Sequence, residues 1–305
     1  MRNAEGKVDI FKFFALLGFT LLSACTSQEG PTDSIPISSL PFTISKSNVR
    51  YYLTSSLTMP NEGGNAITIS PSIHDVVVDL NGYTLSSNMG PRTSAVGVRA
   101  IDPTKIEIRN GTISGFFYGI RIGDTSLEYT NTSGVVIEDI QAQNNTFRAI
   151  RVKGTDVKIR NNIITNTGGT AIYSDSPFVF AVEAFGPGTV IENNFIADTY
   201  TVGNLGEAGA ISLTDGGVNV VVKNNELSNS TPSGSVYLRS MGIWVGGNSV
   251  NQTQASILEN KISNMDWGVA FSSPTSGIYS GNATYNCDIP YFNNSTEVID
   301  GGENL

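Results

Sequence analysis

The chain is organised by a short pattern of apolar and polar positions that recurs along most of its length. An apolar residue is followed by two or three polar positions, often rich in Asn, and a second apolar residue comes five places after the first. The clearest pairs are Ile159 with Ile164, Ile191 with Ile196, Val222 with Leu227, and Ile257 with Ile262. The same frame fits three upstream pairs: Leu80 with Leu85, Ile108 with Ile113 and, more loosely, Ile137 with Ala142. Seven copies at intervals of roughly 22 to 35 residues are typical of a solenoid.

A second motif precedes each Asn-rich one, and it consists of a small residue followed by alternating apolar positions. Its copies are Gly97-Val98, Gly119-Ile120, Ala149-Ile150, Ala171-Ile172, Ala210-Ile211, Gly242-Ile243 and Gly268-Val269. The alternation indicates short strands with one face inward and one outward. A unit of two such strands cannot bury its apolar face alone, so the copies must stack. The sequence therefore predicts an all-β fold, a single right-handed parallel β-helix of about seven to nine coils.

Asn occupies one position in four copies, three residues after the first apolar residue: Asn162, Asn194, Asn225 and Asn260. Successive coils are about 4.8 Å apart. We therefore expect a ladder at a corner of the coil, in which each amide bonds the next and tolerates a left-handed backbone. The alternative is that Asn serves only as a turn residue, and both interpretations predict the same architecture.

Two stretches carry a resemblance to a known superfamily: DVKIRNNIITN followed by GTAIYS, and KIEIRNGTISG followed by FFYGIRI. They resemble the right-handed β-helix, or pectin-lyase-like, superfamily over residues 41–280. The resemblance implies either an enzyme acting on polysaccharides, such as a lyase, hydrolase or uronan epimerase, or a non-catalytic surface protein. The subfamily strings Gly-His-Gly, Asp-Pro-His-Glu and paired Arg are absent from this sequence. No catalytic residue is therefore carried over from a subfamily.

The N-terminal residues are predicted to form an export signal. An apolar run over residues 13–22 follows three basic residues and is too short to span a membrane as a helix. Leu22-Ser23-Ala24-Cys25 then resembles the lipobox of a bacterial lipoprotein, which implies a signal peptide over residues 1–24 and lipidation at Cys25. Thr26 rather than Asp follows, so the resemblance favours an outer-membrane lipoprotein in the cell envelope. An ordinary signal peptide with an incidental Cys is the alternative.

The remaining boundaries follow from composition. Residues 25–40 are rich in Ser, Thr and Pro and are predicted to form a flexible tether, while residues 281–305 lose the repeat and are predicted to form a C-terminal cap and tail. The net charge of −9 excludes attraction of nucleic acid by the surface as a whole. One His and two Cys are too few for a zinc site built on these residues. The cofactor stays unknown, although Asp clusters leave a Ca²⁺ site open.

A row of outward positions lies between the inward apolar residues of the second motif. Coil by coil it contains Arg99, Arg121, Arg151, Tyr173, Ser212, Trp244 and Ala270, with Lys153 on the same side. Like charges about 5 Å apart repel, so the row needs compensation. One source is a network with the carboxylates that follow these strands, Asp102, Asp124, Asp156, Asp175 and Asp215. The other is an acidic sugar, whose carboxylate fits the Arg fork and whose ring fits Tyr173 or Trp244.

Long insertions over residues 174–188, 200–209 and 228–241 flank the same coils and favour a functional wall there. The leading hypothesis is a lyase or epimerase that removes the proton α to a uronate carboxylate. Arg121 or Arg151 would neutralise that carboxylate, and Tyr173 or Lys153 would act as the base. Arg99, Trp244, Asp175 and Asp215 would help to bind the substrate. The alternatives are a glycoside hydrolase using Asp175 and Asp215 as acid and base, and a non-catalytic glycan-binding or adhesin-like protein.

Overall fold

The computed structural model describes residues 33–123, 131–173, 178–201, 206–214, 216–230, 239–247 and 252–305. Cys25, Asp124, Asp175 and Asp215 lie outside these ranges. All described residues belong to one compact unit, Pro31–Leu305. Their secondary structure consists of strands and one short 3-10 helix, η1 (Gly90–Arg92). This part of the chain has no helix long and apolar enough to cross a membrane.

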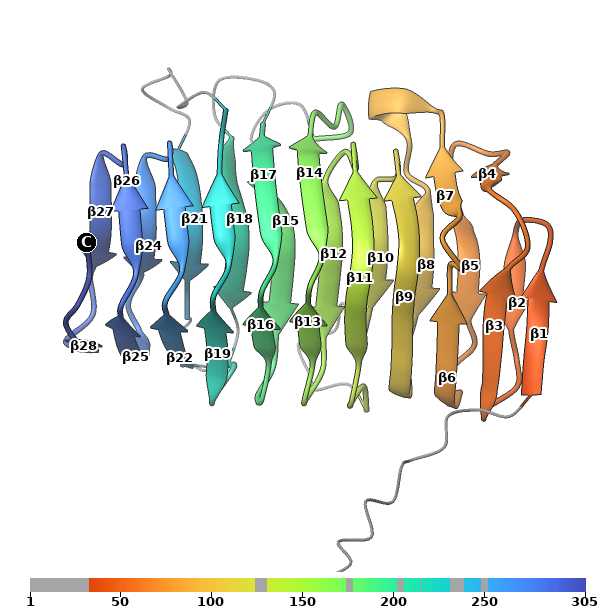
Figure 1. The fold of residues 1–305 in the computed structure, drawn as a ribbon, viewed down its shortest axis with the longest axis horizontal. Coiled ribbons are helices and arrows are strands. Elements are labelled where there is room, and N and C mark those ends of the chain that lie inside the picture. The colour runs from red at the N-terminus through yellow and green to blue at the C-terminus, as the bar shows by residue number, and fades with distance from the viewer. Residues whose placement is uncertain are drawn as a thin grey trace, which may run out of the picture. The chain divides into compact units, whose positions relative to one another are not determined.

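The strands form two parallel sheets that face each other (Figure 1). The ten-stranded sheet contains, in order, β2 (Phe42–Ile44), β5 (Asn65–Ile69), β8 (Val96–Ala100), β10 (Tyr118–Ile122), β12 (Arg148–Lys153), β15 (Phe178–Phe185), β18 (Glu207–Thr214), β21 (Arg239–Val245), β24 (Trp267–Phe271) and β27 (Ile289–Asn293). These strands carry the motif of a small residue followed by alternating apolar positions.

The eighteen-stranded sheet is bent and holds two rows of strands. The first row contains β1 (Asp33–Ile37), β3 (Val49–Leu53), β6 (His74–Asp79), β13 (Lys158–Arg160), β16 (Val190–Glu192), β19 (Val220–Lys223), β22 (Thr253–Leu258), β25 (Thr275–Ser280) and β28 (Glu297–Asp300). The second contains β4 (Leu57–Met59), β7 (Thr84–Ser87), β14 (Ile163–Gly168), β17 (Phe195–Tyr200), β20 (Glu226–Ser228), β23 (Lys261–Ser263) and β26 (Ala283–Tyr285). Two long strands, β9 (Thr104–Ser114) and β11 (Val136–Gln143), run through both rows.

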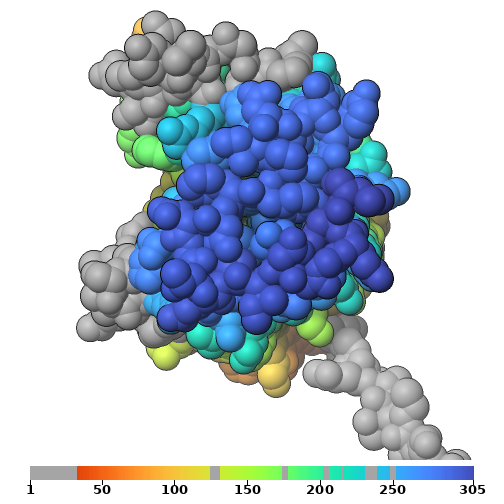
Figure 2. All heavy atoms as spheres, turned by 90° about the vertical axis from the view of Figure 1, so that its left-hand side faces the viewer, coloured from red at the N-terminus to blue at the C-terminus, as the bar shows by residue number. Residues whose placement is uncertain are grey.

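This arrangement confirms the right-handed parallel β-helix, and its coils extend beyond the expected limits. β1 lies inside the stretch predicted as tether, where Ile37 is fully buried and the strand pairs with β3. Pro36 is tolerated there because β1 is an edge strand. β26, β27 and β28 lie where a cap and tail were expected, and the C-terminal residues form the end face seen in Figure 2. The coil structure of the described residues therefore runs from Asp33 to Asp300.

The core consists of apolar columns that run from coil to coil. Ile159, Ile191, Val222 and Ile257 occupy one register and are fully buried, as predicted. A second column contains Ile164, Ile196, Leu227 and Ile262. Burial of each such side chain stabilises the fold by about 1.5–3 kcal/mol. In the upstream coils the first apolar position differs from the prediction: Val78, and not Leu80, pairs with Ile108.

The Asn ladder is confirmed and is longer than predicted. The Nδ2 of each Asn donates to the Oδ1 of the next at 2.9–3.3 Å, through Asn162, Asn194, Asn225, Asn260, Asn282 and Asn304. The left-handed backbone falls one residue earlier than expected, at Asn161, Asn193, Asn224 and Glu259. The ladder Asn therefore serves as a buried hydrogen-bonding residue, and its exposed predecessor makes the turn.

Candidate functional site

The outer face of the ten-stranded sheet carries the predicted row of residues. β8, β10 and β12 place Arg99, Arg121 and Arg151 in one register, one strand spacing apart. Farther along the sheet the row continues through Ser212, Trp244 and Ala270, as expected. We call the first three residues the basic row. The residue that pairs with Arg151 on the next strand is not Tyr173 but Glu183.

Tyr173 was misplaced because two nearby segments fit the same motif. Ala171-Ile172 satisfies the start of the motif, but the strand is β15, which contains Ala181-Val182-Glu183. Ile172 is 40% exposed and cannot be an inward residue. The two segments differ in the residue two places after the apolar residue of the motif. That residue is the apolar Ala184 after Val182 but the polar Ser174 after Ile172, and this difference could have identified the strand. The segment over 174–188, interpreted as a loop, therefore contains a strand of the sheet.

Glu183 binds two arginines. Its Oε2 lies 2.7 Å from Nε of Arg151, and its Oε1 accepts a hydrogen bond of 3.2 Å from Nη2 of Arg148. The three side chains are only 7–16% exposed. Burial by itself would raise the pKa of Glu183, but the two guanidinium groups outweigh it and hold that pKa below its usual value. Part of the basic row is thus compensated by a carboxylate of the sheet itself.

Two of the five carboxylates expected to compensate the row, Asp102 and Asp156, lie within the described residues. Asp102 and Asp156 occupy turns with positive φ after their strands, and Asp156 is exposed. Asp124, Asp175 and Asp215 lie outside the described residues, so the proposed acid and base of a hydrolase are not placed. Among the described residues, the carboxylate that pairs with Arg151 is Glu183, which is not one of the five expected carboxylates.

Arg121 occupies the centre of the basic row and differs from Arg151 in its contacts. Its guanidinium carbon lies 4.8 Å from the centre of the Tyr118 ring, which is a cation–π contact. Its Nε is buried without a hydrogen-bond partner, and Arg121 forms no ion pair among the described residues. Nη1 of Arg151 is also buried without a hydrogen bond, whereas Nε of Arg148 lies 3.2 Å from Oε2 of Glu183 in an ion pair. Arg99, by contrast, donates to the carbonyls of Arg121 and Gly123.

The other predicted site residues lie around this centre. Tyr173 is 49% exposed, and its ring packs at 5.1 Å from the Phe147 ring and 5.9 Å from the Phe117 ring. Lys153 ends β12, in register with Phe185. Trp244 stacks on Phe180 at 5.8 Å and is separated from Arg151 by two strands. The structure thus brings Arg99, Arg121 and Arg151 together, with Tyr173 near their edge and Trp244 farther away.

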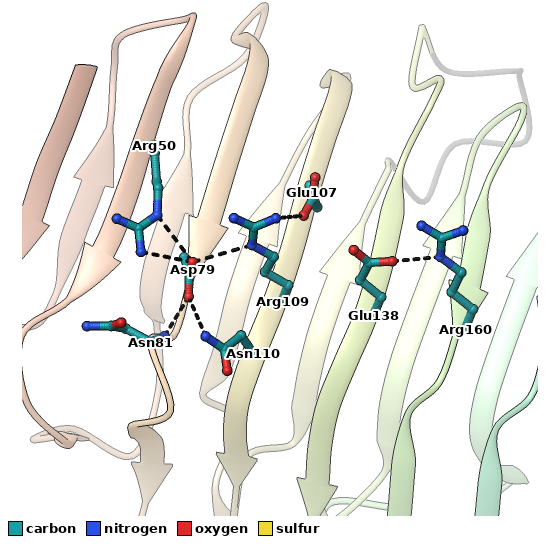
Figure 3. A network of polar contacts seen from close by, with 8 residues as sticks. All are labelled: Arg50, Asp79, Asn81, Glu107, Arg109, Asn110, Glu138 and Arg160. Carbon is teal, nitrogen blue, oxygen red and sulfur yellow. Dashed lines mark hydrogen bonds and ion pairs between the residues drawn. The ribbon is translucent and has the colours of Figure 1, made fainter. Parts of the chain in front are cut away.

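The eighteen-stranded sheet compensates its outward charges in a different way (Figure 3). One register holds residues of alternating sign: Asp79, Arg109, Glu138, Arg160, Glu192 and Lys223. Ion pairs of 2.6–3.3 Å join Asp79 to Arg50 and Arg109, Arg109 to Glu107, Glu138 to Arg160, and Glu192 to Lys223. This charge ladder was not predicted, although the residues after the first apolar positions alternate in sign from Arg109 to Lys223.

Two other features of the described residues bear on the site. A hollow of about 510 Å³ lies on the eighteen-stranded sheet and is lined by residues including Val221, Ser256, Ile278 and Glu297. Its lining contains no cation, so an acidic ligand is not expected there. Within the described ranges, no group of three or more His, Cys, Asp or Glu residues is arranged to hold a metal ion.

The chain belongs to a family of right-handed parallel β-helix proteins. The family model described as "Right handed beta helix region" matches residues 43–252, which is more than half of the sequence. A search of curated proteins gives no match. The family defines the fold and leaves the activity open.

Solved structures are similar to this chain at low identity. The enzymatically active domain of tailspike protein 2 from bacteriophage CBA120 is 13% identical, with a TM-score of 0.51 over 84% of this chain and 38% of that one. A mutant tailspike of E. coli bacteriophage HK620 in complex with a pentasaccharide is 11% identical, with a TM-score of 0.48 over 91% and 61%. The Agl-KA catalytic domain is 15% identical, with a TM-score of 0.44 over 90% and 60%. The chain thus spans about 38–61% of the length of these structures, and the likeness concerns the fold alone.

Proposed function

We propose that this protein binds an acidic polysaccharide on the outer face of the ten-stranded sheet, over β8, β10 and β12. The environment of Arg121 is the observation on which the proposal rests. Arg121 lies in register between two other arginines, and its buried Nε has no hydrogen-bond partner. Arg121 is partly exposed and forms no ion pair with a described carboxylate, so its guanidinium group can take the carboxylate of a bound sugar as its partner.

The contrast between the two sheets supports a ligand on this face. On the eighteen-stranded sheet, Arg50, Arg109 and Arg160 each contact a carboxylate. On the ten-stranded sheet, Glu183 contacts Arg148 and Arg151, whereas Arg121 contacts an aromatic ring instead of a carboxylate. A purely structural network would place a carboxylate beside Arg121 as well. An acidic ligand accounts for the difference.

The chemistry of the face favours binding over proton abstraction. A lyase or epimerase needs a cation for the carboxylate, which Arg121 or Arg151 supplies, and also a base near the α-proton. The phenol that lies against Arg121 is Tyr118, and burial raises its pKa although Arg148 and Arg121 act to lower it. Tyr118 therefore stays protonated near neutral pH. Tyr173 packs on Phe117 and Phe147 at the edge of the face rather than in the basic row.

The test is binding of polyuronates, with alginate and polygalacturonate as probes and dextran as the uncharged comparison. Arg121→Ala should weaken polyuronate binding by about 1.5–3 kcal/mol, the loss of a charged hydrogen bond, or roughly 10- to 150-fold. Affinity of the unchanged protein should also fall as salt rises, because exposed charges are screened within about 8 Å at physiological ionic strength. Calorimetry measures both effects, and absorbance of an unsaturated product reports any lyase activity.

The matched control is Arg160→Ala, which removes an arginine of the same kind from the other sheet. It should leave polyuronate affinity unchanged. Equal affinity for polyuronate in the unchanged protein and Arg121→Ala would refute the binding proposal. A salt-independent affinity equal for polyuronate and dextran would refute the acidic character of the ligand.

We also propose that the protein is held at the outer membrane by a lipid on Cys25. The motif Leu22-Ser23-Ala24-Cys25 supports this assignment, and the first strand begins only eight positions later, at Asp33. Replacement of Cys25 by Ser should move the protein from the membrane fraction to the soluble fraction of the envelope, which fractionation with immunoblotting measures. A protein that stays in the membrane fraction after the replacement would contradict the anchor.

A further inference from the structure

The basic row is short and is closed at both ends. On the N-terminal side, the residue in register with Arg99 is Thr68 of β5, and on the C-terminal side the residue in register with Arg151 is Glu183. Three strands at about 4.8 Å spacing give a row roughly 10 Å long. An acidic chain laid along the solenoid axis would meet the carboxylate of Glu183 immediately after Arg151. Repulsion there disfavours an axial path beyond β12.

A ligand that runs along the strands, and not along the solenoid axis, would contact different side chains. Arg148 begins β12, three positions before Arg151, and Phe147 directly precedes the strand. The guanidinium carbon of Arg148 lies 3.9 Å from the centre of the Phe147 ring. Phe147 stacks on Phe117 at 4.7 Å with 9° between the rings, and the Tyr173 ring covers both. This path leads from cations to aromatic rings and contains no described carboxylate besides Glu183.

Tyr173 ends this path as an exposed aromatic ring. Phe117 and Phe147 are 6% and 8% exposed, whereas Tyr173 is 49% exposed. The backbone beside it is held in place, because the N–H of Thr170 donates to the carbonyl of Thr146 and the N–H of Ala171 donates to the carbonyl of Pro91 in η1. A ring that is already positioned loses little conformational entropy when a ligand packs on it.

We propose that the acidic glycan crosses the sheet along the strands, with its acidic unit on Arg121 and Arg151 and a later sugar ring stacked on Tyr173. This inference rests on the proposed function and specifies its ligand. Phe147 lies four positions before Arg151, which is about 13 Å at roughly 3.3 Å per residue. The ligand is therefore an oligosaccharide of more than one unit. Its acidic end is recognised by charge and its other end by the apolar face of a pyranose ring.

Uronate oligomers of increasing length test this path. In the unchanged protein, affinity should rise in a step at the length that reaches Tyr173. Tyr173→Ala should remove that step, with a loss of about three- to tenfold for long oligomers, and should leave the shortest oligomer unchanged. Tyr173→Phe keeps the ring and should retain the step. Tyr285→Ala is the matched control, because Tyr285 is a 77% exposed tyrosine on β26.

The outcomes separate this inference from the binding proposal. If Arg121→Ala weakens all lengths while Tyr173→Ala binds every length like the unchanged protein, the ligand does not reach Tyr173 and the inference is wrong, but the binding proposal stands. If Tyr173→Ala weakens all lengths equally, Tyr173 acts by supporting Phe117 and Phe147, and the inference is again wrong. If Arg121→Ala changes nothing, the binding proposal itself fails.

Discussion

Replacement of Asn225 by Ala is expected to lower the free energy of unfolding by about 3 kcal/mol or more, because several buried groups lose their partners together. The Oδ1 of Asn225 accepts the backbone N–H and the Nδ2 of Asn194. Its Nδ2 donates to Asn260, at 2.9 Å, and to the carbonyl of Ile191. Asn225 is 1% exposed, so water cannot replace these bonds without opening the corner.

Denaturant unfolding of Asn225→Ala measures the effect, and the preceding residue supplies the control. Asn224 is exposed and has φ of +55°, so Asn224→Ala tests the turn conformation alone. That change should cost only about 1–2 kcal/mol, because Ala lacks the short polar side chain with which Asn stabilises a left-handed backbone. Equal losses for the two variants would show that the turn, and not the ladder, stabilises this corner.

The sequence predicted the structure of the coil correctly at positions whose environment is the same in successive coils. A buried Asn at a corner, an inward Ile and a small residue before a strand each recur because every coil repeats the same contacts. Repetition therefore predicted the column of Ile159 and Ile191 and the bonding of Asn162 to Asn194. It failed at the ends of the solenoid, where the pattern weakens. Asn282 and Asn304 nevertheless continue the ladder there.

The site was less predictable because it depends on insertion length. A stretch of extra residues before a strand moves the strand without changing its motif, and two candidate motifs then compete. Choosing Ala171 over Ala181 placed Tyr173 where Glu183 lies. This error hid the carboxylate of the sheet, and with it the end of the basic row. The three arginines were found because the coils of Arg99, Arg121 and Arg151 carry the motif without a competing copy.

Glu183→Gln is expected to destabilise the protein and at the same time to strengthen its binding of acidic glycans. The change leaves Arg148 and Arg151 without their carboxylate, although both side chains are largely buried. Breaking a buried ion pair by removing one partner typically costs about 3–5 kcal/mol. Binding should respond in the opposite direction, because the negative charge beside the basic row disappears. A stability loss with unchanged or weaker glycan binding would contradict the placement of the ligand beside Glu183.

The pH dependence of unfolding gives an independent measure of the same residue. The pKa of Glu183 is lower in the folded protein than its usual value, because Arg148 and Arg151 outweigh the effect of burial. Its ionic contribution to stability is therefore complete above the ordinary carboxyl pKa of about 4.3 and is lost as pH falls through the lower folded pKa. The stability difference between the unchanged protein and Glu183→Gln should be largest at neutral pH and should shrink in acid.

Glu207→Gln is the control: its partner Arg239 lies 3.8 Å away and both side chains are more exposed, so the change should cost at most about 1 kcal/mol. If the two variants lost equal stability at neutral pH, Glu183 would not hold the arginines of this face.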